Sequence, residues 1–204
     1  MNFESIGEPF CIIKNTNPKA NIPILSISAD DEARNSFNEI ILKPNETFQL
    51  IPNPQKERQI LYISGQSGSG KSYFVMKYCN EFKKIFPKRD IYLLSSVNED
   101  SSIDKIKGLK RIKLTPEFLE DTLTAEDFKD TCVIFDDCDT ISDKKIRKKV
   151  KDLFDSIAQT GRHFNVYCCV TSHLACNAGE SKHQLNESNS ITIFPKSMGN
   201  RSLK

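Results

Sequence analysis

The sequence predicts an α/β fold in which helices cover a mainly parallel sheet, and three observations support this. From residue 60 onward, apolar runs of strand length alternate with stretches of helical periodicity. The run 131–135 is apolar almost throughout, as expected of a central parallel strand that is buried on both faces. A glycine-rich segment, 65–72, separates one apolar run from a helix-patterned stretch, so strand, loop and helix follow one another.

Composition limits the classes of protein to consider. A chain of 204 residues with 38% hydrophobic and 27% charged residues is an ordinary globular domain with room for a small appendage. The net charge of +2 gives no overall field for nucleic acid, so such a site would be local or shared between subunits. Neither a membrane-length apolar stretch nor a signal peptide is found, which predicts no membrane association and a cytoplasm-like compartment.

Residues 1–57 are expected to form a small β-rich N-terminal segment. The last two of its expected strands flank the turn-like residues 43–46 and are predicted to pair as a hairpin. A polar, proline-bearing stretch, 51–58, marks the boundary to a core of residues 58–204. The expected strands of the segment are 9–13, 22–27, 39–42 and 47–51.

The core is expected to alternate strand and helix. Its helix 71–86 is predicted to bury Phe74, Tyr78, Phe82 and Ile85 at helical spacing. A second, amphipathic helix is expected over 143–159, with a short helix near 103–106 and a broken one over 117–128. The expected strands are 60–63, 91–94, 111–114, 131–135, 165–170 and 190–194.

The glycine-rich segment has the pattern of a phosphate-binding loop. Its glycines let backbone N–H groups point inward, and the helix start adds unpaired N–H groups and a positive dipole end. Lys71 would then reach the β- and γ-phosphates of ATP, and the Ser72 hydroxyl would ligate Mg²⁺. The alternative, a glycine-rich turn without a ligand, explains the preceding strand and following helix less well. The loop consists of Gly65, Gln66, Ser67, Gly68, Ser69, Gly70, Lys71 and Ser72.

Two acids, Asp136 and Asp137, end the apolar run that begins at Cys132. Asp136 is predicted to hold Mg²⁺ together with Ser72. Asp137, one residue further out, is predicted to orient or deprotonate the attacking water. Helix capping is the alternative role for both acids, and the phosphate-binding loop upstream makes it less favoured.

Five segments together resemble the genome-packaging ATPases of large nucleocytoplasmic DNA viruses, which belong to the HerA/FtsK group of additional-strand, RecA-like P-loop ATPases. The resemblance covers residues 60–204 and implies a three-layer core. It extends to no part of the N-terminal segment. The segments are 61–72, 133–137, 160–163, 170–173, and 185–187 with 193–195.

The resemblance implies ATP hydrolysis coupled to translocation of double-stranded DNA into a capsid by a homo-oligomeric ring. It implies contact with a capsid or portal-vertex protein, and a location at the virus assembly site in the host cytoplasm or in the virion. Thr171 or Ser172, at the end of the strand between the two motif strands, would sense the γ-phosphate. Arg162, at the turn after the basic helix, would complete a neighbouring subunit's site. A surface arginine and an ordinary polar strand end are the alternatives.

Two features depart from the family pattern. Many relatives have Asp-Glu where this chain has Asp136-Asp137, so the second acid is one methylene shorter. The sequence also stops soon after its last expected strand, at residues 200–204, with little room for a closing helix, so we expect either a compact core or a fragment.

Two further patterns leave alternatives open. The stretch 144–151 has six cations on the polar face of its helix, which could face solvent or contact phosphates. The seven cysteines are odd in number and contain no C-x-x-C pair, so we interpret them as small core hydrophobes rather than a zinc site. They are Cys11, Cys79, Cys132, Cys138, Cys168, Cys169 and Cys176.

Other functional classes share the loop. A soluble nucleotide or nucleoside kinase would need an arginine-rich lid, and the sequence shows no clear one. A small GTPase is less favoured because no N-K-x-D tetrapeptide occurs. A nucleotide-binding assembly protein with slow hydrolysis is the third alternative, and the candidate metal and base residues argue against it.

Overall fold

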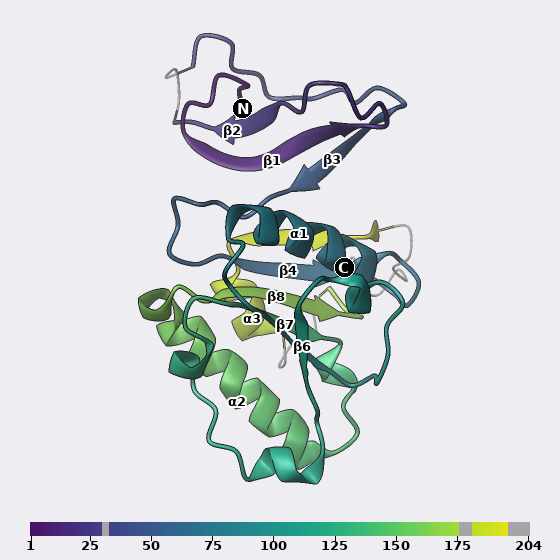
Figure 1. Ribbon diagram of the computed structural model, residues 1–204, viewed down its shortest axis with the longest axis vertical. Helices are drawn as coiled ribbons and strands as arrows, with labels where there is room; N and C mark the ends of the chain where they lie inside the picture. The colour runs from purple at the N-terminus through teal and green to yellow at the C-terminus, as the bar shows by residue number, and fades with distance from the viewer. Residues whose placement is uncertain (30–32, 176–180, 196–204) are drawn as a thin grey trace. The chain divides into compact units, whose positions relative to one another are not determined.

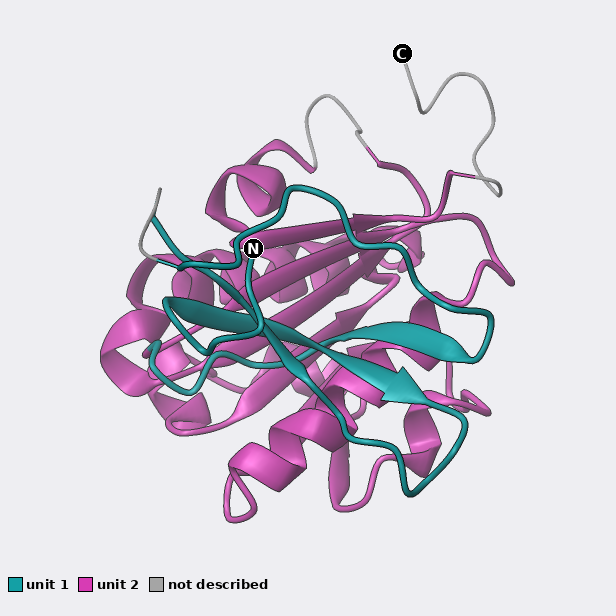
Figure 2. Cartoon of the chain, turned by 90° about the horizontal axis from the view of Figure 1, so that it is seen from above, with its two compact units in different colours: residues 1–56 teal, residues 57–204 magenta. Residues whose placement is uncertain are grey.

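A computed structural model describes residues 1–29, 33–175 and 181–195 of the chain. It divides into two compact units, residues 1–56 and 57–204, each described here by itself (Figure 2). Cys176 and the chain end at 200–204, which entered the sequence predictions, lie outside the described residues. Among the described residues, no helix combines the length and apolarity needed to cross a bilayer.

The first unit is a three-stranded antiparallel sheet. Its central strand is β1 (Glu8–Asn15), which pairs with β2 (Ile24–Ile27) on one side and β3 (Glu46–Leu50) on the other. Three buried side chains, Cys11, Ile13 and Leu25, form its small core. The unit is therefore β-rich, as the sequence indicated.

The strand expected at 39–42 is wrong, and so is the hairpin that it was to form with β3. The turn itself forms, because the Glu46 N–H donates to the Lys43 carbonyl at 2.9 Å. β3 pairs with β1 instead, with Leu50 opposite Cys11. Ile40 packs on the unit's core while Ile41 is 85% exposed, so this apolar run supplies a single buried contact rather than one face of a strand.

The second unit is built on a six-stranded sheet in the order β6-β5-β7-β8-β4-β9, and every pair is parallel. β8 lies between β4, which precedes the phosphate-binding loop, and β7, which ends in the two acids. This extra strand confirms the expected additional-strand P-loop fold. The strands are β4 (Ile60–Ser64), β5 (Ile91–Ser95), β6 (Leu109–Ile112), β7 (Cys132–Asp136), β8 (Tyr167–Ser172) and β9 (Ser190–Ile193).

Helices α1 (Lys71–Ile85) and α2 (Lys144–Thr160) lie on opposite sides of the sheet and make three layers (Figure 1). α1 buries Val75, Tyr78, Cys79 and Phe82, whereas Phe74 and Ile85, expected to be buried, are only half-buried. The Phe82 ring packs on Tyr167 of β8 with centroids 5.3 Å apart. Tyr167 therefore faces α1.

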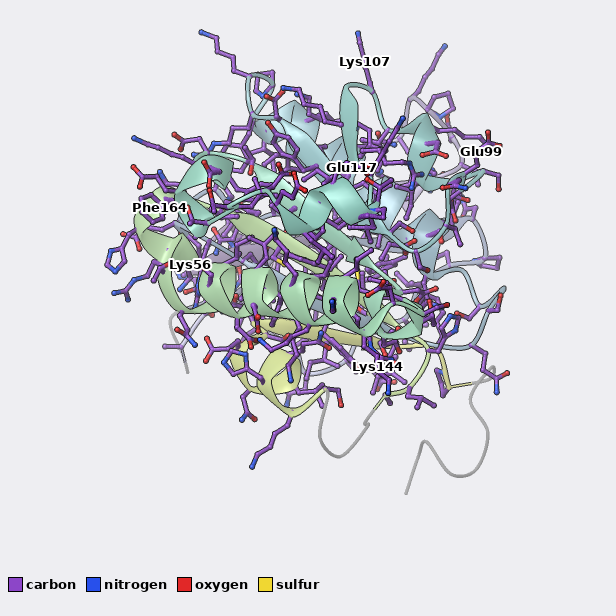
Figure 3. The ribbon with its side chains drawn as sticks, turned by 90° about the horizontal axis from the view of Figure 1, so that it is seen from below. Lys56, Glu99, Lys107, Glu117, Lys144 and Phe164 are labelled. Atoms are coloured by element: carbon purple, nitrogen blue, oxygen red, sulfur yellow. The ribbon has the colours of Figure 1, made fainter. Side chains whose placement is uncertain are left out.

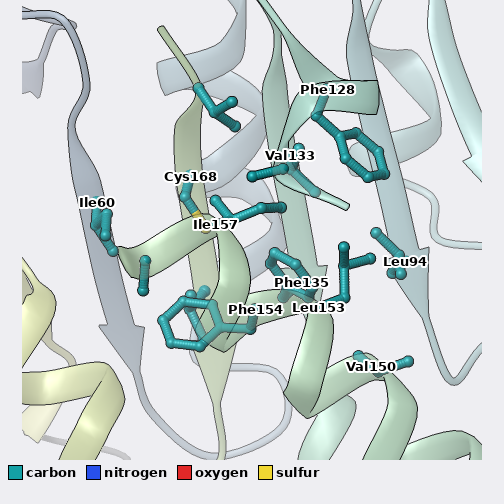
Figure 4. Packing of buried hydrophobic residues seen from close by; sticks show 14 of the residues in the cluster. Ile60, Leu94, Phe128, Val133, Phe135, Val150, Leu153, Phe154, Ile157 and Cys168 are labelled. Atoms are coloured by element: carbon teal, nitrogen blue, oxygen red, sulfur yellow. The ribbon is translucent and has the colours of Figure 1, made fainter. Parts of the chain in front are cut away.

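α2 covers the other face of the sheet. It begins at an N-cap, Asp143, whose carboxylate accepts the N–H groups of Lys145 and Ile146. Its apolar side packs on β7 and β8, with the rings of Phe154 and Phe135 5.5 Å apart and perpendicular (Figure 4). The helix thereby buries the expected stripe of Ile146, Val150, Leu153, Phe154 and Ile157.

Short elements complete the unit. The expected edge strand forms as β6, beginning at Leu109 and ending at Ile112, two residues earlier than predicted. The broken helix consists of two 3-10 turns, Pro116–Leu119 and Ala125–Phe128. A short helix, α3 (Lys182–Glu187), precedes β9 and was not expected from the sequence.

Candidate active site

The phosphate-binding loop joins the end of β4 to the start of α1. Gly70 has φ +105°, a backbone conformation that side chains rarely adopt, and it caps α1 directly before Lys71. A Cβ at Gly65 would lie 2.6 Å from Ser69 Oγ and 3.0 Å from Phe194, so any other residue there would have to displace the Ser69 side chain and press on Phe194. The Lys71 ammonium is buried and donates to the Gly65 carbonyl at 2.9 Å.

The two acids lie at the same edge of the sheet, because parallel strands bring their carboxyl ends together. Asp136 is 3% exposed and accepts hydrogen bonds from Ser95 Oγ at 3.0 Å and Thr171 Oγ1 at 2.9 Å. Burial, followed by the neighbouring charge of Asp137, holds the pKa of Asp136 above its usual range. The Asp137 carboxylate lies 3.5 Å from Lys71 Nζ.

The Thr171 hydroxyl connects both acids. It accepts the Asp137 backbone N–H at 2.8 Å and lies 2.9 Å from Asp136 Oδ1 and 3.1 Å from Asp137 Oδ1. A hydroxyl has one proton, so Thr171 can donate to only one carboxylate at a time. The end of β8 therefore contacts both the candidate metal ligand and the candidate base.

Asp137 is held from several directions. His173 Nε2 lies 3.1 Å from Asp137 Oδ2, opposite the side that Lys71 and Thr171 contact through Oδ1. The backbone of Asp137 is left-handed, with φ 45° and ψ 38°, a region in which aspartate is several-fold enriched among non-glycine residues. Both the backbone and the contacts fix this carboxylate at the end of β7.

A pocket of about 490 Å³ opens over this edge of the sheet. It is lined by the phosphate-binding loop, the two acids, His173 and the loop after β5. Ser72 lines it beside the acids, as the predicted pairing of Ser72 and Asp136 requires. The residues that come from the loop after β5 are Ser96, Val97, Glu99, Asp100 and Ser102.

Ser172 lies on the other face of the sheet from Thr171, because side chains alternate along a strand. Its hydroxyl is 3.2 Å from Asp139 Oδ2 and accepts the Leu174 N–H at 3.3 Å. Ser172 and Asp139 line a second pocket, of about 190 Å³, whose rim is basic. Of the two sensor candidates, only Thr171 contacts the acids of the larger pocket.

The residues present fit ATP and Mg²⁺. The loop is a backbone cradle that a Cβ at Gly65 would fill, and Ser69 Oγ is a buried donor that has no partner among the described residues. Asp136 is a buried carboxylate that accepts hydrogen bonds from two hydroxyls, and it lines the same pocket as Ser72. Oxygen ligands of these two kinds suit Mg²⁺. The loop amides and Lys71 would hold the phosphates.

Comparison with known proteins finds a relative of this chain in a virophage. No family model matches the chain. "Uncharacterized protein V3" of the Sputnik virophage is 39% identical over 200 residues, which cover 97% of this chain and 78% of the virophage protein. The chain belongs to the V3 family.

A solved structure shares the fold of this V3-family chain. The cytoplasmic domain of EssC superposes over 93% of this chain with a TM-score of 0.55 at 14% identity. This chain spans only 36% of that EssC chain. The conjugation coupling protein TcpA of pCW3, solved as a monomer with ATPγS, superposes over 87% of this chain and 63% of its own length, with 12% identity and a TM-score of 0.46.

Arg162 of this V3-family chain lies far from its own phosphate-binding loop. It belongs to a 3-10 turn, Gly161–Phe164, that leads into the amino end of β8, whereas the loop and the acids lie at the carboxyl ends of the strands. Figure 3 shows Phe164 of this turn at the opposite end of the unit from Glu99, which lines the pocket. Arg162 is 64% exposed and lies 3.6 Å from Glu57.

Sequence reasoning missed Ser95 and Thr140. Ser95 ends β5 and donates to Asp136, and Thr140, which follows the acids, lines the pocket. A polar residue at the carboxyl end of an apolar run was the available signal for Ser95. Glu99 and Asp100, in the loop after β5, also line the pocket, and nothing in their spacing along the sequence indicates that this loop returns over it.

Proposed function

We propose that this V3-family protein is a Mg²⁺-dependent ATPase motor that translocates double-stranded DNA and packages a viral genome into a capsid. The observation that carries the proposal is the Thr171 hydroxyl between Asp136 and Asp137, on a strand inserted between the loop strand and the acid strand. A strand end that contacts both the metal-side acid and the water-side acid suits a hydrolytic site better than a simple binding site.

Each side chain has a distinct role in this proposal. Lys71 and the loop amides bind and orient the phosphates. When bound through Ser72 and Asp136, Mg²⁺ neutralises charge on the phosphate oxygens. Asp137 orients a water molecule and takes its proton, and its contacts with Thr171 and His173 hold the carboxylate oxygens in place.

A homo-oligomeric ring gives Arg162 a role that it cannot have within its own chain. Its guanidinium lies at the amino end of β8 and is largely exposed, so in a ring it would meet the nucleotide of the adjacent subunit. Charge supplied in this way stabilises phosphoryl transfer. A capsid or portal-vertex protein would be the docking partner, at the assembly site in the host cytoplasm or in the virion, and the virophage relative supports this viral setting.

The deciding experiment is ATP turnover by the full chain with and without duplex DNA, repeated for Asp137→Asn. We expect DNA to stimulate ATP hydrolysis. The substitution should lower the rate of hydrolysis by about a hundredfold or more. Asp121→Asn, an exposed acid outside the pocket, is the matched control and should retain turnover. Phosphate transfer to a nucleoside acceptor would identify a kinase instead. Turnover that is indifferent to both DNA and Asp137→Asn would contradict the proposal.

A further inference from the structure

Three cysteines from distant parts of the sequence meet beneath α1. The sulfurs of Cys79, Cys132 and Cys169 all lie within 4.8 Å of one another. Each side chain is 0% exposed, and each is a free thiol. Cys79 belongs to α1, Cys132 begins β7 and Cys169 lies in the middle of β8, so the cluster joins three separate elements.

The strand register explains why these sulfurs meet. Cys169 lies opposite Ile134, two residues along β7 from Cys132, so both cysteines occupy the same face of the sheet. Tyr167, two residues before Cys169, shows that this face packs against α1, because its ring contacts Phe82. Cys168 points to the opposite face, where it packs within the core beneath α2 (Figure 4).

The arrangement has the dimensions of a thiolate metal site. Metal–sulfur bonds of about 2.3 Å place the three sulfurs of a trigonal site about 4 Å apart, inside the observed limit. Isolated buried cysteines usually act as small hydrophobes, but such packing gives no reason for three sulfurs to converge on one point. Sulfur ligands select soft cations such as Cu⁺ and Zn²⁺ over Mg²⁺.

We propose that Cys79, Cys132 and Cys169 bind one soft, thiophilic cation. Among the described residues the group has three ligands, a set that Cu⁺ accepts, whereas Zn²⁺ usually takes four. The cation displaces protons from the thiols that it binds. With Cu⁺ in this dry site, two thiols release their protons to solvent and bind as thiolates, which leaves a net charge of −1, and the third stays protonated as a weak contact.

The cation would stabilise the elements that carry the nucleotide site. α1 begins with Lys71 and Ser72, β7 ends with Asp136, and β8 leads to Thr171. A bond network joining these three elements opposes their separation during unfolding. This site is separate from the proposed ATPase chemistry and is tested without any measurement of turnover.

The test is metal binding by the full chain, expressed with added copper or zinc salts and purified without oxygen. Native mass spectrometry should find one metal ion per chain, and titration with Cu⁺ should give sulfur-to-copper charge-transfer absorption that saturates at one equivalent. Cys132→Ser and Cys169→Ser should lose this stoichiometric binding. Cys168→Ser is the matched control, because Cys168 is equally buried on the same strand but faces α2, and it should bind as the unchanged chain does.

Several results would overturn the proposal. The unchanged chain could bind neither Cu⁺ nor Zn²⁺, or it could bind them equally well after Cys132→Ser and Cys169→Ser. Equal loss in Cys168→Ser would also count against this cluster. If the serine variants fail to fold, X-ray absorption of the copper-loaded unchanged chain decides the question. A first shell of two to three sulfurs supports the site, and an oxygen or nitrogen shell refutes it.

Discussion

The Thr171 hydroxyl lies 2.9 Å from Asp136 Oδ1, and this contact joins the sheet's inserted strand to its acid-bearing strand. Thr171 Oγ1 also accepts a hydrogen bond from the backbone N–H of Asp137 at 2.8 Å. A nucleotide that alters either carboxylate therefore changes the hydrogen bonding at the end of β8. We expect this hydroxyl to couple the state of the site to the strand.

Replacing Thr171 with valine keeps the shape of the side chain and removes the hydroxyl. The partly buried Asp137 N–H then loses its partner, which should cost about 1 kcal/mol of folding stability. ATP turnover should fall by roughly tenfold or more, because the carboxylates lose a fixed donor. Thr171→Ser keeps the hydroxyl and should restore most of both quantities. Denaturant unfolding and steady-state turnover check this, and a fully active valine variant would contradict it.

Asp136→Asn should stabilise the nucleotide-free protein at neutral pH while it abolishes ATP turnover. The folded protein holds the pKa of Asp136 above its unfolded value, so the folded state binds the proton more tightly. Stability contributed by this group is therefore greatest at low pH and is lost as pH rises through the folded pKa. Removing the charge should raise stability at pH 7 by roughly 1 kcal/mol, as is common at strained functional sites.

Unfolding measured from pH 3 to pH 7 checks this expectation. The difference between Asp136→Asn and the unchanged chain should grow with pH across the interval above the ordinary pKa of aspartate. Asp121→Asn, whose side chain is exposed, should show no such growth. A constant difference, or a variant that becomes less stable as pH rises, would show that burial of the Asp136 charge does not oppose folding.

Arg162→Ala tests whether one subunit completes the site of another. Alone, this variant should lose turnover by two orders of magnitude or more, the range in which a charge supplied in trans contributes. Lys71→Ala alone should also be inactive, because its phosphate-binding loop is broken. A mixture of the two variants should recover activity, because each Lys71→Ala chain offers its Arg162 to the intact phosphate-binding loop of an Arg162→Ala neighbour. Failure of the mixture to recover, in the presence of stable rings, would sink the assignment.

The basic face of α2 should set the salt dependence of DNA binding. Lys144, Arg147, Lys148 and Lys151 follow the i, i+3, i+4, i+7 spacing of one helix face and line the smaller pocket together. Lys148 is paired with Asp152 at 2.6 Å, which leaves Lys144 and Lys151 as the better test positions. Changing both to glutamine should lower the slope of log affinity against log salt by roughly two.

Duplex binding measured at several salt concentrations gives this slope directly. The matched control is Lys88→Gln, an exposed lysine in the segment that follows α1, away from the α2 face. It should change the slope by less than the α2 variant does. An unchanged slope in the double variant would mean that this face meets solvent rather than phosphates.

Contiguous motifs could be predicted from the sequence, and contacts between elements could not. The phosphate-binding loop and the Asp136-Asp137 pair each lie in one short segment, so the strands that carry them could be located from the sequence. The choice between Thr171 and Ser172 depends on the register of β8, which alternation alone leaves ambiguous. The cysteine cluster joins α1, β7 and β8, and no spacing along the chain indicates it.

Local propensity failed where a short apolar run served another purpose. Residues 39–42 have the composition of a strand, but among the described strands β3 pairs with β1 alone, and its other edge takes up no strand. Ile41 is left exposed, so the run packs through Ile40 alone. A short strand is stabilised by its cross-strand neighbours, and the sequence does not say which neighbours are free.

The left-handed backbone at Asp137 restricts which amino acids evolution can place there. Aspartate, asparagine and glycine adopt this conformation most readily, and of these only aspartate supplies a carboxylate. A lineage under selection for catalysis would therefore retain aspartate for its backbone as well as for its charge. A homologue with glutamate at this position should have a differently shaped turn after β7. The shorter acid therefore goes together with the left-handed turn that follows β7.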